Sequence, residues 1–218
     1  QNTIDKFNFS TEANATDVGN LTSARTGAFA GCSEETHGYA CGGATPTMTN
    51  IIDRYSFSSD GDAVDVGDLF QNNKAQAGAN TSTHGYTAGG ALNDAGSRTT
   101  NIHKFAFGSS TSSSDVGDVS VIRSHCTGAC SITHGYAAGG DPSASVTIDK
   151  YSFATEANAT DVGDLTGGGY GHGGQCSLTY GYATGGYRNA YSNIIDKCAF
   201  ASDGNSTDVG DLTVGRRL

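Results

Sequence analysis

The chain has 218 residues and a formal net charge of -10, with 12 lysines and arginines against 22 aspartates and glutamates. This balance argues against a nucleic-acid partner, because a phosphate backbone is bound through clustered basic side chains. No apolar run approaches the roughly 20 residues that a membrane-crossing helix needs, so we expect no membrane insertion.

The sequence repeats itself with a period that suits propeller blades. The triplet Asp-Val-Gly recurs at intervals of 46 to 50 residues, and blades occupy about 40 to 50 residues, whereas common helical repeats are shorter. The 32 glycines are spread along the chain, and no window sustains helical periodicity. We therefore predict one all-β repeat domain over residues 1–218, with units at about 1–22 (partial), 23–70, 71–120, 121–166 and 167–218.

Each full unit contains four expected strands in the same order. The first follows a basic residue, Arg25, Lys74 or Arg123, and the second is a phrase such as HGYAAGG that ends in two glycines. A variable segment leads to the third strand, Ile-Asp-Lys followed by an aromatic residue. A tip rich in Asp, Asn and Gly then turns into the fourth strand, Asp-Val-Gly-Asp-Leu.

Four short antiparallel strands with apolar residues on both faces cannot cover those faces alone, so we expect the units to stack as blades around an axis. The chain opens on a third strand and reaches Leu218 where a first strand would begin. This phase predicts about five blades, the first incomplete, or a segment of a larger ring. Unpaired blade faces tend to find partners, so a homo-oligomer or larger particle is a candidate state.

The phrase GYAAGG resembles the signature of kelch repeats, in which a Tyr precedes a glycine pair, an aromatic stands in the third strand and a basic residue follows the fourth. The matching aromatics and basic residues are Tyr55, Phe105, Tyr151, Arg25, Lys74, Arg123 and Arg216. The resemblance implies a kelch-type β-propeller like that of galactose-oxidase-like proteins. The chain departs from it where a fourth-strand Trp is usual, with Val18, Val66, Val116, Val162 and Val209 in its place.

The units are also nearly identical to one another, with TEANATDVG at Thr11 and again at Thr155. In this they resemble the kelch-like arrays of environmental phage virion proteins, which implies an extracellular or virion-associated location.

Recurring chemical groups have structural interpretations. Cys32 and Cys41 can meet across a hairpin, whereas Cys126 and Cys130 lie about 13 Å apart if extended, and we expect mostly free thiols. The repeated histidines His37, His84 and His134 would lie on different blades, too far apart for one metal ion, so we expect them to pack in turns.

The Asp-Val-Gly-Asp carboxylates point to opposite faces of a strand and do not converge on calcium. We expect them to pair with the Arg or Lys eight or nine residues on, or with loop amides, and we expect no metal and no cofactor.

Catalysis has one alternative to consider. Galactose-oxidase-like proteins bind copper through Tyr and His beside a Tyr crosslinked to Cys, which makes a copper oxidase the distant alternative. Here Tyr and His stand mostly at repeated positions, and no constellation breaks the repeat as a single catalytic centre must. We expect no enzymatic activity.

The fourth unit departs furthest from the others and supplies the candidate ligand-binding residues. Clustered Tyr with Arg and Asn suits a sugar, whose apolar faces stack on rings while its hydroxyls take hydrogen bonds. The candidates are Tyr170, His172, Tyr187, Arg188, Asn189 and Tyr191. The chain is therefore interpreted as a particle-associated binding or structural module for a cell-surface glycan or protein receptor; the alternative is a self-assembling extracellular fibre or scaffold subunit.

Six Asn-x-Ser/Thr sequons are candidate glycosylation sites if the host glycosylates the chain. Three of them share one hairpin tip, where a turn residue that tolerates Asn is the structural alternative. The six are Asn8, Asn14, Asn20, Asn80, Asn158 and Asn205.

Overall fold

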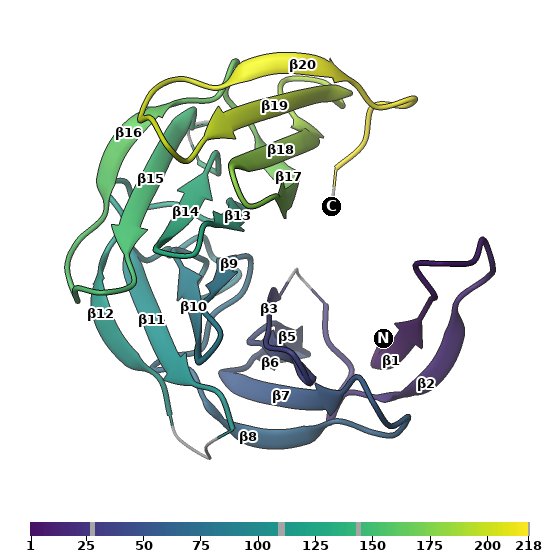
Figure 1. The fold of residues 1–218 in the computed structure, drawn as a ribbon. Coiled ribbons are helices and arrows are strands. Elements are labelled where there is room, and N and C mark those ends of the chain that lie inside the picture. Colours follow the sequence, from purple (N-terminus) through teal and green to yellow (C-terminus); the bar gives the residue numbers. More distant parts are fainter. Residues whose placement is uncertain (27–28, 109–111, 143–144, 218) are drawn as a thin grey trace.

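A computed structural model of the chain describes residues 1–26, 29–108, 112–142 and 145–217. These residues form strands and no helix, and so no helix that is long and apolar enough to cross a membrane. The strands build a four-bladed β-propeller of four-stranded antiparallel sheets, which confirms the predicted fold class (Figure 1). A two-stranded sheet, the N-terminal hairpin, precedes the four blades.

The N-terminal hairpin consists of β1 (Thr3–Lys6) and β2 (Thr16–Asn20). Blade I contains β3 (Ala30–Ser33), β4 (His37–Cys41), β7 (Ile51–Ser56) and β8 (Val64–Asp68), with a small hairpin β5 (Ala44–Thr45) and β6 (Thr47–Met48) between its second and third strands. Blade II contains β9 (Ala77–Asn80), β10 (His84–Ala88), β11 (Asn101–Ala106) and β12 (Ser114–Asp118). Blade III contains β13 (Thr127–Cys130), β14 (His134–Ala138), β15 (Thr147–Ser152) and β16 (Thr160–Asp164). Blade IV contains β17 (Tyr170–Cys176), β18 (Tyr180–Tyr187), β19 (Ile194–Ala199) and β20 (Thr207–Asp211).

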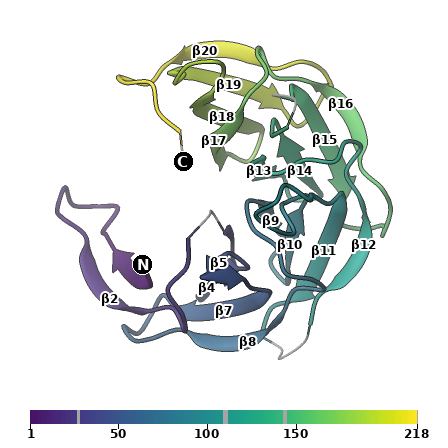
Figure 2. The ribbon, with the colours of Figure 1, turned by 180° about the vertical axis from the view of Figure 1, so that it is seen from behind.

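The first strand of each blade lies nearest the centre and the fourth lies at the rim (Figures 1 and 2). The blades follow one another around an arc that is open on one side. Both views place the N-terminal hairpin at one border of this opening and blade IV at the other. The hairpin occupies the place of a third and a fourth strand, as the phase of the repeat predicts.

The glycine pairs link each blade to the next. Gly89 and Gly90 have φ angles of 66° and 117°, a left-handed region that side chains with a Cβ rarely adopt. This turn aims the Gly90 N–H at the carbonyl oxygen of Arg123, 2.8 Å away, in the connection to the following blade. The same bond recurs from Gly43, Gly140 and Gly186. The glycines that the repeat pattern singled out therefore join successive units.

A buried ion pair fastens the incoming connection of a blade to its third strand. Arg25 bonds Asp53 in blade I and Arg123 bonds Asp149 in blade III, each over 2.6 Å between side chains that are at most 1% exposed. The Arg123 guanidinium also donates to the carbonyl oxygens of Ala137 and Thr147. The basic residues of the repeat thus bind their own blade.

Blade II has uncharged residues at the two positions of this ion pair. The residue at the arginine position is Asn73, and the prediction that Lys74 fills it is wrong, because Lys74 forms the bridge to Ala91 that Ser124 forms to Asp141 in blade III. His103 takes the place of the buried aspartate, and burial lowers its pKa to about 4, so it is neutral near pH 7. Both positions have changed together, which leaves no unpaired buried charge at either of them.

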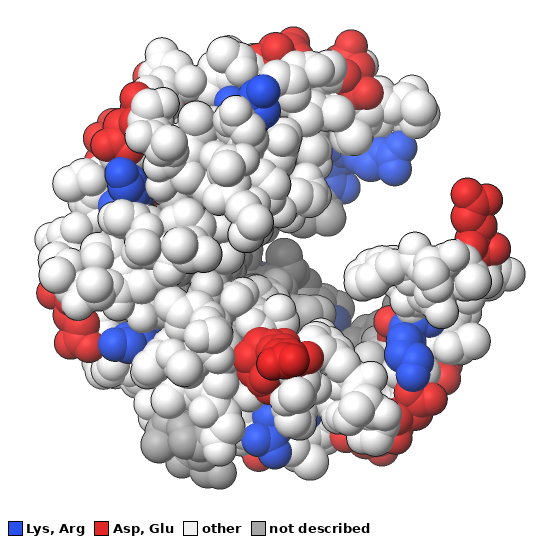
Figure 3. Space-filling model, viewed as in Figure 1, with Lys and Arg blue, Asp and Glu red and all other residues white. Residues whose placement is uncertain are grey.

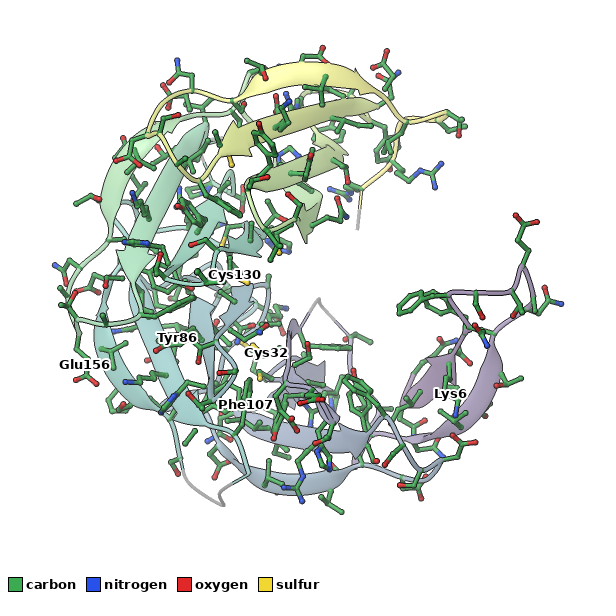
Figure 4. All side chains as sticks on the ribbon, viewed as in Figure 1. Lys6, Cys32, Tyr86, Phe107, Cys130 and Glu156 are labelled. Carbon is green, nitrogen blue, oxygen red and sulfur yellow. The ribbon has the colours of Figure 1, made fainter. Side chains whose placement is uncertain are left out.

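The hydrophobic core lies between the sheets. Tyr86 and Tyr151 pack with small residues of blades II and III, and equivalent clusters lie between blades I and II and between blades III and IV. Figure 4 shows Tyr86 in this position. The fourth strands contribute Val66, Val116 and Val162 to these clusters. These valines hold the position at which the sequence resemblance led us to expect a Trp. Stacked Tyr and Phe rings supply the bulk that the valines lack.

Candidate functional site

Three of the proposed ligand-binding tyrosines lie together in blade IV. Tyr170 begins β17 and pairs with Tyr187 at the end of β18, and their ring centroids are 5.5 Å apart. Tyr191 follows in the connection to β19, with its ring centroid 5.8 Å from that of Tyr187. We call these three residues the tyrosine cluster. They meet because β17 and β18 pair over more residues than the first two strands of the other blades.

Arg217 completes the cluster. Its guanidinium carbon lies 5.4 Å from the Tyr170 ring centroid and 5.5 Å from that of Tyr187, and its Nη1 donates a 3.1 Å hydrogen bond to the Tyr170 hydroxyl. A cavity of about 320 Å³ lies beside it, lined by Tyr191, Gly215, Arg216 and Arg217. Tyr191 is 62% exposed and borders this cavity. The repeat pattern gives no signal for Arg217, because Arg216 is the residue that aligns with the basic residues of the other units.

Arg188 has a different place from the tyrosines. Its Nη2 donates a 2.5 Å bond to the buried Asp196, and its Nη1 donates to the hydroxyl of Thr166. Gly169 occupies the arginine position of this unit, and a Cβ there would lie 2.7 Å from the Arg188 side chain. Arg188 therefore crosses from the other connection and fills the space of the missing arginine, in the role that Arg25 and Arg123 have elsewhere.

His172 and Asn189 also lie apart from the tyrosine cluster. His172 lies inside β17, buried, with Nδ1 2.9 Å from the carbonyl oxygen of Gly185, and burial lowers its pKa. It lines a central cavity of about 300 Å³ together with His125 and inner-strand glycines. Asn189 is exposed at the tip of its turn with φ 66°, a left-handed conformation that Asn tolerates better than most residues.

The six sequons fall on two kinds of site. Asn8, Asn14, Asn158 and Asn205 are in or near hairpin tips, and all four are exposed. In Asn158 and Asn205 the side-chain oxygen accepts a backbone N–H from the preceding blade, at 3.1 and 3.0 Å. Asn20 and Asn80 are half-buried at the ends of strands, and Nδ2 of Asn20 donates to Asp62.

The repeated histidines and aspartates each serve their own turn. Nδ1 of His37, His84 and His134 lies 2.7 to 2.9 Å from the hydroxyl of the preceding threonine. The first Asp of each Asp-Val-Gly accepts the N–H of the glycine two residues on, at 3.0 to 3.3 Å. The expected loop-amide partner is thus an amide of the same triplet, while the arginines of blades I and III pair with third-strand aspartates instead. No group of three or more metal-binding side chains gathers within the described part of the chain.

All six cysteines lie in the described ranges, and all are free thiols. Cys130 and Cys176 end the neighbouring inner strands β13 and β17, and they line a cavity of about 560 Å³ with the exposed Ile132 and Leu178. Figure 4 shows Cys130 and Cys32 on inner strands. The Cys130 thiol donates a hydrogen bond to Cys176 and lowers the pKa of Cys176 to about 6, while the same bond raises the pKa of Cys130.

Alkylation should therefore select Cys176. Because the thiolate is the reactive form, its labelling by iodoacetamide is expected to reach half its maximal rate near pH 6, whereas an ordinary thiol has a pKa of about 8.5. Peptide mass spectrometry across a pH series measures this midpoint. Cys130→Ala removes the hydrogen-bond donor and should move the midpoint upward; an unchanged midpoint in that variant would contradict the assignment.

Comparison with known proteins adds no relative. The chain matches none of the protein-family models against which it was scanned, and it matches no curated protein in sequence.

Proposed function

We propose that this chain is a non-enzymatic, kelch-type binding module that recognises carbohydrate through the tyrosine cluster and Arg217 of blade IV. One observation carries the proposal: three tyrosine rings and a guanidinium gather beside a surface cavity in the unit that differs most from its siblings. Rigid scaffolds with recognition residues on their connections are a common design for binding proteins.

The chemistry of the cluster suits a sugar. Tyrosine rings offer flat apolar faces to the C–H side of a pyranose, and their hydroxyls offer hydrogen bonds to its edge. Arg217 donates one N–H to Tyr170, and its remaining donors are available for sugar hydroxyl or carboxylate oxygens. The cavity of about 320 Å³ has the size of the smaller ligand sites of proteins.

The wider setting of the proposal is a virion or another extracellular particle. Its support is the near-identity of the units and the glycine pairs, which the kelch-like arrays of virion proteins share. The cell-surface glycan would then be the receptor to which the particle attaches.

Binding to a glycan array tests the proposal. We expect the labelled chain to bind a subset of glycans, and Tyr187→Ala combined with Tyr191→Ala to weaken binding by about tenfold or more, since each aromatic contact contributes about 0.5–1.5 kcal/mol. Arg217→Gln should weaken it as well. Tyr180→Ala is the matched control, because Tyr180 lies at the opposite end of β18. An array without signal, or signal that the double variant leaves intact, rejects the site.

A further inference from the structure

One ring contact recurs between successive blades. In blades I to III, the tyrosine in the second strand packs on a phenylalanine that follows the third strand of the next blade. The pairs are Tyr39 with Phe107, Tyr86 with Phe153 and Tyr136 with Phe200, with centroid distances of 4.5, 4.6 and 4.8 Å. Each of these tyrosines is buried. The contact is therefore a standard part of the blade interface.

A second set of contacts fastens the rim. A third-strand lysine pairs with an acidic residue in the hairpin tip of the next unit, as Lys104 does with Glu156 at 3.2 Å and Lys150 with Asp203 at 2.8 Å. Lys6 pairs with Asp60 in the same way. Figure 4 shows Glu156 at the rim of the molecule. In each of these pairs the acidic residue comes from the hairpin tip of the unit that follows the lysine in the chain.

Backbone groups complete the rim contact. Asp118 N–H donates to Asn158 in the next tip, and the N–H of Ala159 returns a 2.8 Å bond to the carbonyl oxygen of Asp118. Asp164 makes the same exchange with Asn205 and Ser206. The tip approaches so closely that a Cβ on Gly163 would lie 2.3 Å from the carbonyl oxygen of Gly204.

In blades I to III, one surface receives the hairpin tip and the phenylalanine of the next unit. In blade IV this surface is not covered by another described unit. Tyr182 stands in the position of the stacked tyrosines, but it is only half-buried and has no ring partner among the described residues. Lys197 takes the lysine position; its ammonium lies 4.7 Å from the Tyr180 ring centroid, and it has no acidic partner within the described ranges. Val209 is 46% exposed, whereas its counterparts are half-buried, and a Cβ on Gly210 would meet no described atom within 4 Å.

The N-terminal hairpin carries the opposite surface, with the phenylalanine and the tip residues that contact a preceding blade elsewhere in the chain. Phe9, in the position of the stacked phenylalanines, is 96% exposed. Glu12 stands where Glu156 and Asp203 stand, and Asn14 stands where Asn158 and Asn205 stand; Glu12 and Asn14 are both exposed. The hairpin therefore carries the residue types that the other blades receive from the following unit, including Glu12, whose charge is opposite to that of Lys197.

We infer that the N-terminal hairpin of a second copy of this chain docks on blade IV, so that copies associate head to tail. Figure 3 shows the opening between the two surfaces as a gap that side chains do not fill. The hairpin of the same chain is held to blade I by Lys6 with Asp60 and by Asn20 with Asp62, and its first residues bond Leu21 and Arg25. Closing the gap within one chain would have to break or bend these contacts, whereas a second copy supplies the same hairpin with all of them intact.

In such an assembly Phe9 of one copy stacks on Tyr182 of the next, Glu12 pairs with Lys197, and Asn14 accepts the Asp211 N–H. The two surfaces differ from each other, so the contact is heterologous, and copies add one after another in a row or around a larger ring.

Sedimentation velocity of the 218-residue chain over a range of concentrations tests the inference. We expect the mean mass to rise with concentration. Lys197→Glu or Glu12→Lys should each weaken association by about tenfold at low salt, because either change places like charges together. Phe9→Ala should weaken it further, as a buried aromatic anchor usually does. Glu35→Lys is the matched control for Glu12→Lys, since it makes the same change in charge outside both surfaces.

Mixing the two charge variants tests whether the hairpin docked on blade IV belongs to a second copy of the chain. In the mixture, blade IV of the Lys197→Glu variant meets the hairpin of the Glu12→Lys variant with the two charges exchanged. The unchanged Lys197 of the second variant likewise meets the unchanged Glu12 of the first, so association in trans should return to the level of the original chain. A monomeric original chain, or association that neither reversal weakens, overturns the inference. Variants that stay monomeric when mixed also overturn it, because residues 12 and 197 would then not meet between two copies.

Discussion

Arg123→Ala is expected to lower the free energy of unfolding by about 3–5 kcal/mol, the usual cost of leaving a buried charge without its partner. Asp149 is fully buried, and Arg123 is its ionic partner. The Ser120 N–H, 3.0 Å from the same carboxylate oxygen, would remain as a donor. Urea denaturation followed by circular dichroism measures the loss.

Blade II supplies the compensating variant for this experiment. Asn73 and His103 show that the same two positions accept two uncharged residues. Arg123→Asn combined with Asp149→His should therefore recover at least half of the stability that Arg123→Ala loses. A double variant that is less stable than the single one would show that the two positions do not act as a pair.

Gly128→Ala is expected to destabilise the chain by about 3 kcal/mol, at the upper end of the usual cost of overpacking. A Cβ on Gly128 would lie 2.1 Å from the carbonyl oxygen of Gly78 in the inner strand of blade II. The clash is with backbone, which cannot turn aside as a flexible side chain can, so the blades would have to separate. The same urea titration detects the effect.

Gly31→Ala is the matched control, because Gly31 stands at the same position of blade I and a Cβ there meets no described atom within 4 Å. This variant should stay within about 0.5 kcal/mol of the original chain. Equal losses in the two variants would mean that the cost arises within a strand rather than between blades.

The repeat predicted the blades well because every unit has the same local sequence features. The length of the period, the glycine pairs and the alternating apolar residues are properties of one segment at a time, and they determine strand order and stacking. The exposed Phe9 and the half-buried Tyr182 also follow from the phase of the repeat, once the partners of their counterparts are known.

The candidate site was less predictable because its contacts join segments that the repeat does not align. Arg188 appeared as a loop residue, yet its partner Asp196 and the empty space at Gly169 become apparent only in three dimensions. His172 appeared in a connection, but β17 begins two residues earlier and encloses it. Arg217 could have been found by asking which basic residue follows the aligned Arg216.

Arg188 fills the space beside Gly169, where blades I and III have an arginine. The two connections of blade IV that contain Gly169 and Arg188 therefore depend on each other. Replacing the segment around Gly169 alone with that of blade I or blade III would bring two guanidinium groups to Asp196. Replacing the segment around Arg188 alone would leave that carboxylate without any. Recombination among near-identical units would therefore preserve the fold only when both segments travel together. The loops that look free to diversify are constrained by one carboxylate that they share at the base of the blade.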